Sequence, residues 1–143
     1  MKPIIFSYLI IILIILASCK NPYKAENIVF TSDKTMVINQ LHHEFDFKNI
    51  DFSGIGLNLN GQKTIDLQVK INDPIFTEKE ILFAQRLAQS IKKQVANINH
   101  FNVISIEINV HEKLPSGYNG KMKKILLDQK TLKEISSNKY FNM

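Results

Sequence analysis

The chain has 143 residues, a formal net charge of +5 and a single cysteine, and 45% of its residues are hydrophobic. That length suits one domain with a core large enough to fold without disulfides or metal. A lone cysteine cannot form a disulfide within its own chain. The mild positive charge, without a known nucleic-acid-binding motif, argues against nucleic acid as a partner.

The first segment has the pattern of a secretory signal. Lys2 supplies a positive charge, an apolar run extends from Ile4 to Leu16, and the small residues Ala17 and Ser18 follow. The alternatives are an N-terminal membrane anchor or a buried core helix. The run is too short for the first, since a spanning helix needs about 20 apolar residues. We therefore expect residues 1–18 to be a signal peptide.

The residues that end this segment, Leu16-Ala17-Ser18-Cys19, resemble the lipobox of bacterial lipoprotein precursors. The resemblance covers residues 1–19 only. It implies that a diacylglycerol is attached to the Cys19 sulfur, that cleavage occurs just before Cys19, and that the lipid bilayer is a partner. Two or more buried acyl chains give stable anchoring.

The residue after the cysteine bears on localisation. In lipoproteins of Gram-negative cells an Asp there signals retention in the inner membrane, whereas this chain has Lys20. The resemblance thus implies the outer membrane, facing the periplasm. The first acidic residue is Glu26, which does not fit the acidic signal of surface-exported lipoproteins. In a Gram-positive cell the outer face of the plasma membrane is expected.

Residues 19–32 lack a clear period and are expected to be the lipidated cysteine and a tether. From Ser32 or Asp33, either of which can cap a helix, apolar residues recur at helical spacing. They are Val37, Ile38, Leu41 and Phe45. This spacing predicts a helix, although residues 28–31 and 45–52 are equally compatible with extended structure.

Two strands are expected around Asn60-Gly61, because apolar and polar residues alternate over 55–59 and 65–71. If both apolar rows face the core, Leu57 must oppose Ile65, which needs a three-residue loop over 60–62. A five-residue connection, or a bulge near Gly54 or Gly56, is the alternative. Either excludes a tight two-residue turn, which would oppose Leu57 to Thr64.

A second helix is predicted after Pro74. Thr77 and Glu80 have the spacing of a capping box, and Phe76 and Ile81 that of a hydrophobic staple. One face of the following segment is apolar, formed by Ile81, Ala84, Ala88, Ile91, Val95 and Ile98. His100 is expected to close this helix, where a cation complements the helix dipole.

Alternation over 104–110 predicts a third strand and residues 122–127 a fourth, with a loop over 115–120. Thr131 and Glu134 are expected to cap a short C-terminal helix. The expected fold is α+β, a two-layer sandwich with a four-stranded antiparallel sheet and helices on one face, in the order α-β-β-α-β-β. Residues 33–143 would form this single domain.

No nucleophile stands in a recognisable catalytic motif, and no cofactor is expected. His42, His43, Glu44 and Asp46 are candidate metal ligands by residue type. On a helix, however, His42 and His43 diverge by about 100°. His111 and Glu107 would share one strand face, but two ligands are too few for a metal site. We therefore expect no metal.

The face of the sheet away from the helices is the remaining candidate site. Its expected residues are Asn58, Asp66, Gln68, Lys70, Ser105, Glu107, Asn109 and His111. Such a polar platform suits a protein, peptide or glycan, although antiparallel sheets commonly leave one face to water. The seven lysines from Lys113 onward would either approach anionic headgroups or form a solvated surface.

The sequence thus predicts a membrane-anchored envelope lipoprotein that acts as a small binding, accessory or immunity-type module, possessing no catalytic activity. An envelope protein is the expected macromolecular partner. The alternative is a small envelope enzyme or metal-binding protein.

Overall fold

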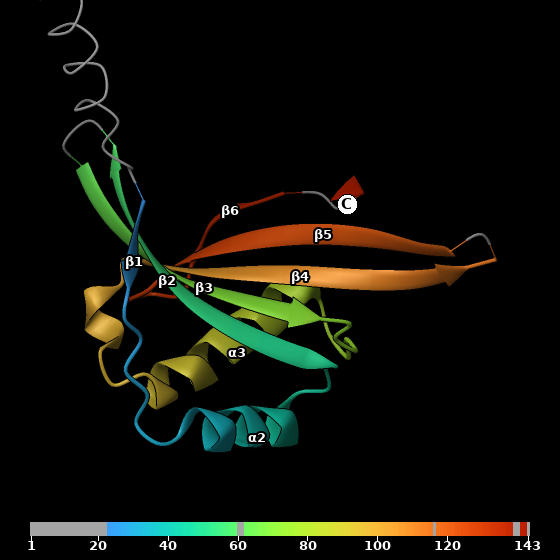
Figure 1. Ribbon diagram of the computed structural model, residues 1–143, viewed down its shortest axis with the longest axis horizontal. Helices are drawn as coiled ribbons and strands as arrows, with labels where there is room; N and C mark the ends of the chain where they lie inside the picture. Colours follow the sequence, from blue (N-terminus) through green and yellow to red (C-terminus); the bar gives the residue numbers. More distant parts are fainter. Residues whose placement is uncertain (1–22, 60–61, 116, 139–140, 143) are drawn as a thin grey trace, which may run out of the picture.

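A computed structural model describes residues 23–59, 62–115, 117–138 and 141–142 (Figure 1). The predicted signal peptide and Cys19 lie outside these residues. The elements in chain order are β1 (Tyr23–Glu26), α2 (Lys34–Glu44), β2 (Asn49–Leu59), β3 (Gln62–Asn72), α3 (Glu80–Gln94), the 3₁₀ turn η1 (Ile98–His100), β4 (Val103–Leu114), β5 (Gly117–Asp128), β6 (Glu134–Ser137) and β7 (Phe141–Asn142). Among them, no helix has the length and apolar character needed to cross a membrane.

The strands form one mixed sheet in the order β1-β2-β3-β4-β5-β6, and β7 also pairs with β5. The predicted four-stranded antiparallel sheet is therefore wrong. All described pairs are antiparallel except β3 and β4, which run parallel. The reason is the connection between them: α3 carries the chain back along the sheet, and a helical crossover joins neighbouring strands in parallel.

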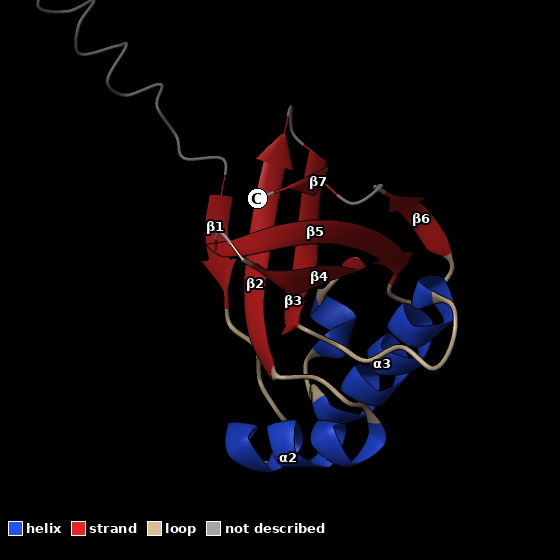
Figure 2. Ribbon diagram, turned by 90° about the vertical axis from the view of Figure 1, so that its right-hand side faces the viewer, coloured by secondary structure: helices blue, strands red, loops and turns tan. Residues whose placement is uncertain are grey.

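Both α-helices of the described residues cover the same face of the sheet (Figure 2). The prediction of α2 is confirmed: Asp33 is its N-cap, and the backbone N–H of Thr35 donates to Asp33 Oδ1 at 2.8 Å. Val37 and Leu41 are buried on its inner side. The extended alternative is realised directly afterwards, since β2 begins at Asn49.

The second helix was predicted in the right place with the wrong start. α3 begins at Glu80 with Lys79 as its N-cap, and no side chain caps it, so Thr77 and Glu80 form no capping box. Phe76 packs edge-on against Phe83, with ring centroids 5.0 Å apart. His100 lies in η1 beyond the end of α3, so it does not close the main helix.

The register of β2 and β3 contradicts the expected hairpin. Leu57 opposes Thr64 and Ile55 opposes Asp66, and pairing runs from Asn49 to Leu59 without a bulge. This is the register of a two-residue connection; residues 60–61 themselves lie outside the described chain. The physical reason is that β2 faces the core through Ile50 and Phe52, which are buried opposite Ile71 and Val69. The apolar row of Ile55 therefore lies on the other side.

The predicted C-terminal helix is also absent from the described residues. Thr131 donates from its backbone N–H and from Oγ1 to Asp128 Oδ1, both at 2.8 Å, and Leu132 adopts a positive φ of 56°. The turn sends the chain back along β5, so Glu134 begins β6 instead of a helix. At the other end, Tyr23–Glu26 pairs with β2 as β1, within the segment expected to be a tether.

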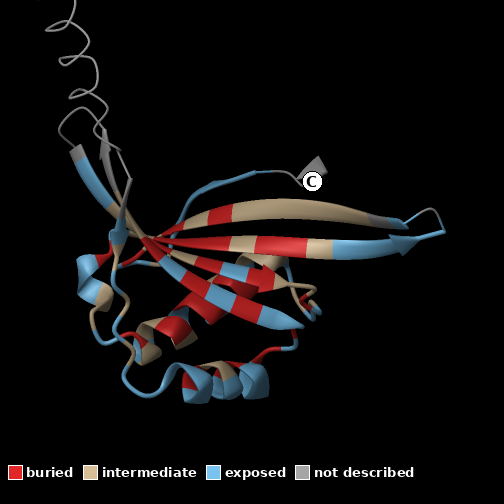
Figure 3. Cartoon of the chain, viewed as in Figure 1, coloured by how far each residue is buried: buried red, intermediate tan, exposed pale blue. Residues whose placement is uncertain are grey.

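The core lies between the two helices and the sheet (Figure 3). Its fully buried members from the sheet are Leu67, Val69, Ile71, Ile104, Ile106, Ile108, Ile125 and Leu127. Those from α3 are Phe83, Ala84, Leu87, Ala88 and Ile91. Since neighbouring residues of a strand point to opposite faces, the residues that alternate with these core positions define the face away from the helices.

Candidate binding face

Three rows of polar residues cross β2, β3 and β4 on the face away from α2 and α3. The strand registers place Asn49, Asn72 and Asn109 in one row, Asp51, Lys70 and Glu107 in the next, and Ser53, Gln68 and Ser105 in the third. We call these nine residues, with Asp66 of β3 and Lys124 of β5, the polar face. It is built by the four neighbouring strands β2 to β5.

The middle row alternates in charge across the sheet. Asp51, Lys70, Glu107 and Lys124 are successive cross-strand partners. Lys70 Nζ lies 3.1 Å from Glu107 Oε1, and Lys34 Nζ of α2 lies 3.3 Å from Asp51 Oδ1. Opposite charges on neighbouring strands attract and offset one another. The row therefore carries little net charge of its own and offers both donors and acceptors.

A hollow of about 130 Å³ lies within this part of the face, lined by Asp51, Ser53, Gln68, Val69, Lys70 and Glu107. Its side chains offer both donors and acceptors: a hydroxyl, an amide, an ammonium and two carboxylates. The hollow is small, so it suits a single side chain of a macromolecule better than a whole cofactor, whose sites are usually several hundred Å³.

The asparagine row is a chain of amide hydrogen bonds. Asn109 Nδ2 donates to Asn72 Oδ1 at 2.9 Å, and Asn72 Nδ2 donates to Asn49 Oδ1. Asn109 is only 4% exposed, and its Oδ1, like Ser105 Oγ, has no hydrogen-bond partner among the described residues. A buried polar atom without a partner costs about 1–3 kcal/mol. Both atoms are buried, so this cost falls on the stability of the fold.

Beside the asparagine row, Asp73 and His111 form a pair. Asp73 Oδ1 accepts the backbone N–H of His111 at 2.7 Å and lies 3.0 Å from its Nδ1. Asp73 has a φ of 49°, a left-handed conformation that Asp tolerates better than most residues. Burial opposes ionisation, but the hydrogen bonds from His111 outweigh it and lower the pKa of Asp73. The two residues line a hollow of about 200 Å³ with Lys48, Asn49 and Asn72.

Asp66 is the acid of the polar face whose ionisation the fold disfavours. Partial burial raises its pKa above the usual 3.8, and the positive charge of Lys124 offsets only part of this effect. At neutral pH the negative charge of Asp66 therefore costs folding energy. The cost is absent below pH 3.8, where the carboxyl is protonated in both the folded and unfolded states, and it is fully present above the raised pKa.

We expect Asp66→Asn to increase the free energy of unfolding at pH 7, because the neutral amide avoids the burial cost of the charge. The gain should shrink as the pH falls through the raised pKa of Asp66 and vanish below 3.8. Urea unfolding of both proteins across pH 3–8 measures it. Asp46→Asn, at an exposed position, is the matched control and should change stability less. A variant that is less stable than the wild type at pH 7 would show that the attraction to Lys124 dominates.

Most of the residues predicted for the binding face come together. Asp66, Gln68, Lys70, Ser105, Glu107 and Asn109 all lie on the polar face. His111 lies just beyond it, at the edge where β3 ends. Asn58 pairs with Lys63, so it belongs to the alternate row of β2, and its side chain lies outside the described residues.

The sequence reasoning missed Asn49, Asp51, Ser53, Asn72 and Lys124. The available signal was the alternation of Ile50 and Phe52 with Asp51 and Ser53, which predicts a strand whose polar row joins the face. The predicted strand begins at Ile55, where the apolar residues change from even to odd positions. That choice assigned the wrong row of β2 to the core.

The two histidines that are candidate metal ligands by residue type, His42 and His43, form no metal site in the described residues. The ring of His42 stacks on Phe47 at 4.0 Å between centroids, and His43 is exposed. Within the described part of the chain, no three His, Cys, Asp or Glu residues lie close enough together to hold a metal ion.

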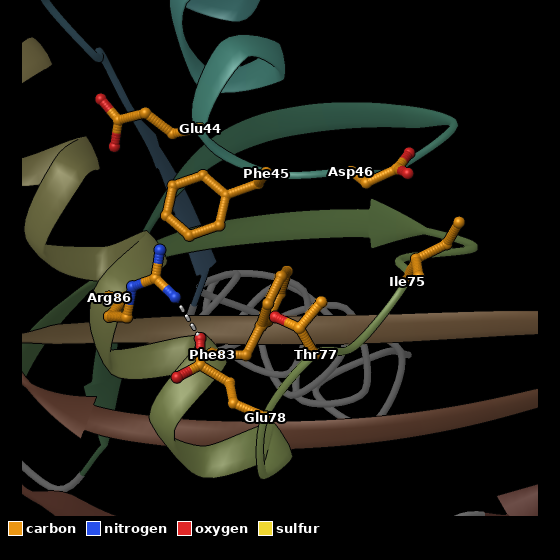
Figure 4. A pocket seen from close by; sticks show the side chains of 8 residues that line it. All are labelled: Glu44, Phe45, Asp46, Ile75, Thr77, Glu78, Phe83 and Arg86. Carbon is orange, nitrogen blue, oxygen red and sulfur yellow. Dashed lines mark hydrogen bonds and ion pairs between the residues drawn. The ribbon is translucent and has the colours of Figure 1, made fainter.

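A third hollow, of about 200 Å³, lies between the end of α2 and the start of α3 (Figure 4). Arg86 of α3 is one of the residues that line it. Its Nη1 donates to Glu78 Oε1 at 2.6 Å, and its guanidinium lies 5.5 Å from the ring centroid of Phe45. The arginine is already held by a carboxylate and a ring, so it links neighbouring elements and stabilises the fold. The polar face is therefore the better candidate site.

The fold and the polar face are therefore the basis for any functional assignment, since comparisons with protein-family models, curated proteins and solved structures found no match to this chain.

Proposed function

We propose that this chain is a lipid-anchored envelope protein that binds another envelope protein through the polar face and performs no catalysis. The observation that carries the binding role is the row structure of that face. Charged and amide side chains from four strands are held in place by hydrogen bonds and ion pairs, next to a hollow. Side chains that are ordered before binding lose less conformational entropy when a partner arrives.

The anchoring role rests on the lipobox-like residues Leu16 to Cys19. Strand β1 begins at Tyr23, only four residues after the cysteine. At 3.3–3.6 Å per residue, these residues span at most about 14 Å. This is much shorter than the tether expected from the sequence, so an acylated Cys19 would hold the sheet close to the bilayer.

Position-specific crosslinking in the native cell tests both roles. A photoreactive residue at Gln68, within the polar face, should capture a discrete partner. The same residue at Gln89, exposed on α3, is the matched control and should not capture it. Lys70→Glu should abolish capture from position 68, because it places a third negative charge between Asp51 and Glu107.

The anchor is tested in the same cells with Cys19→Ala. We expect the unlipidated precursor to remain unprocessed or to leave the membrane fraction after export. A Cys19→Ala chain that is processed and stays on the membrane would overturn the anchoring role. Equal capture from positions 68 and 89 would overturn the assignment of the face, whatever the result for Cys19.

The alternative is a small envelope enzyme or metal-binding protein, and the Asp73–His111 pair is the observation that favours it. A carboxylate that orients a histidine is a common part of catalytic and metal sites. Elemental analysis of the purified chain separates the two functions. Stoichiometric metal that is lost in His111→Ala would favour the alternative.

A further inference from the structure

Strands β4 and β5 extend well beyond the end of β3. The β3 register with β4 ends at Asn72 opposite Asn109, whereas β4 continues to Leu114. Residues 110–114 of β4 pair with residues 117–121 of β5, and we call this two-stranded segment the ribbon. It projects from one end of the sheet, and its outer part is exposed (Figures 1 and 3). In the described chain no strand pairs with the other edge of β4 along the ribbon.

The main chain of this edge is oriented for pairing with another strand. The N–H of His111 points outward, away from β5, because it donates to the Asp73 carboxylate at 2.7 Å. Main-chain groups alternate in direction along a strand, so the N–H and C=O of Lys113 point outward as well. The Asp73 carboxylate thus lies where a strand added to β4 beyond the end of β3 would begin. In the described chain no strand pairs with the positions of β4 that follow.

The charges along this edge favour an acidic partner. Glu112 is paired with Lys121 within the ribbon at 3.0 Å, and Asp73 is engaged by His111. Lys113 of the ribbon and Lys48 beside its base have no ion pair among the described residues. Both lysines are exposed. An acidic segment placed along the edge would therefore meet the unpaired charge of Lys113 and that of Lys48, which already attracts the Asp73 carboxylate at longer range.

A second copy of the chain fits this edge poorly. Two antiparallel copies related by a two-fold axis must align their outward-pointing residues, 111 and 113. The pairings that use the main chain of Lys113 place either Lys113 opposite Lys113 or Glu112 opposite Glu112. Like charges directly opposed on neighbouring strands are destabilising. An exposed lysine at an edge is also a common device against self-association.

The ribbon points away from the predicted anchor. Tyr23 begins β1 opposite Leu57, at the end of the sheet where β2 ends and β3 begins. Because β4 runs parallel to β3, its far end lies at the opposite end of the sheet. At about 3.3 Å per residue, the tip of β4 lies roughly 40 Å from the level of Tyr23. This placement rests on the proposed anchor and puts the ribbon where a protein beyond the membrane surface can reach it.

We infer that the open edge of β4 along the ribbon binds an extended acidic segment of a protein partner by strand addition. The main chain of Lys113 forms the hydrogen bonds with the added strand, and Lys48 and Lys113 select acidic side chains. Strand addition of this kind derives affinity from main-chain bonds and specificity from side chains.

A peptide titration tests the inference. The full chain is purified in detergent, and the probe is a fluorescent seven-residue peptide in which glutamate and valine alternate. We expect it to bind and to shift the amide resonances of residues 111–114. Lys113→Pro should weaken binding about tenfold or more, because it removes the outward N–H. Proline is tolerated at an edge position whose N–H faces solvent, so the ribbon should remain intact.

Two controls separate charge from main-chain pairing. Lys113→Thr keeps the N–H and should weaken binding less, with a loss that disappears at high salt. A peptide of alternating lysine and valine should not bind. Absence of binding by the acidic peptide, equal binding of both peptides, or full binding by a folded Lys113→Pro chain would each overturn the inference. If Lys113→Pro fails to fold, the amide shifts and Lys113→Thr decide the question. Crosslinking from Gln68 is read separately, so failure here leaves the polar-face proposal standing.

Discussion

Replacing Ile106 by alanine is expected to lower the free energy of unfolding by about 2–5 kcal/mol, the range for removing a buried isoleucine side chain. Ile106 lies in β4, between Val69 of β3 and Ile125 of β5, and is fully buried. The truncation removes apolar contacts and leaves a cavity that the surrounding sheet cannot readily close. Since small domains are stable by only about 5–15 kcal/mol, the loss is a large share of the total.

Urea unfolding followed by circular dichroism measures this change. Ile135→Ala is the matched control, because Ile135 of β6 is 55% exposed. Its substitution should change stability by less than about 0.5 kcal/mol, as is usual for surface positions. Equal losses in the two variants would contradict the placement of the core between β4 and the helices.

Gly54→Val is expected to detach β1 from the sheet. A Cβ atom at Gly54 would overlap the carbonyl oxygen of Glu26 and lie 3.0 Å from its carbonyl carbon. Both atoms belong to the backbone, so the clash cannot be relieved by rotating a side chain. Moving β1 away gives up its pairing with β2, and we expect a loss of about 1–3 kcal/mol, typical of overpacking.

Hydrogen exchange at Ala25 and Glu26 reports the release directly, and exchange in β3 and β4 should stay slow. Ser53→Val provides the control: it adds the same side chain to the neighbouring exposed position and suits a strand. If Gly54→Val keeps the protection of β1, the close approach of Glu26 to Gly54 is wrong. In a lipid-anchored chain the loss of β1 would also lengthen the link between the bilayer and the sheet.

Local patterns were sufficient for the elements whose stability depends on nearby residues. The Asp33 cap and the apolar residues Val37 and Leu41 predicted α2, and all three act within one helix. Alternation likewise predicted β3 and β4, because their apolar residues keep one parity from end to end. Six of the eight expected face residues follow from those two strands alone, which explains why they were found.

The errors arose where two distant segments had to be compared. In β2 the apolar residues change parity near Gly54, from Ile50 and Phe52 to Ile55 and Leu57. The sequence offers two rows and does not say which one meets the helices. The partners Val69 and Ile71 decide it, because a slip of one residue would turn every side chain of the strand to the other face. Asp51 and Ser53 were missed for this reason.

The predicted order α-β-β-α-β-β is wrong at both ends, because β1 precedes α2 and β6 and β7 follow β5, and the predicted strand directions are wrong as well. Because β3 and β4 are neighbours and α3 carries the chain back between them, these two strands run parallel. At the C-terminus, Thr131 and Glu134 have the spacing of a helix cap. Thr131 instead bonds to Asp128, and the exposed edge of β5 offers the following residues backbone partners that an isolated short helix lacks.

By itself, the sequence determined the N-terminal signal pattern with Cys19 as the expected lipidation site, the helices α2 and α3, and the strands β3 and β4 with their apolar rows. These depend on spacing between residues near each other in the chain. Only the tertiary structure decided the register of β2, the pairing of β1 and β6, the three polar rows and the open edge of the ribbon. Each of these depends on hydrogen bonds and burial between segments far apart in the chain, where several pairings satisfy the same local pattern and the packed core selects one.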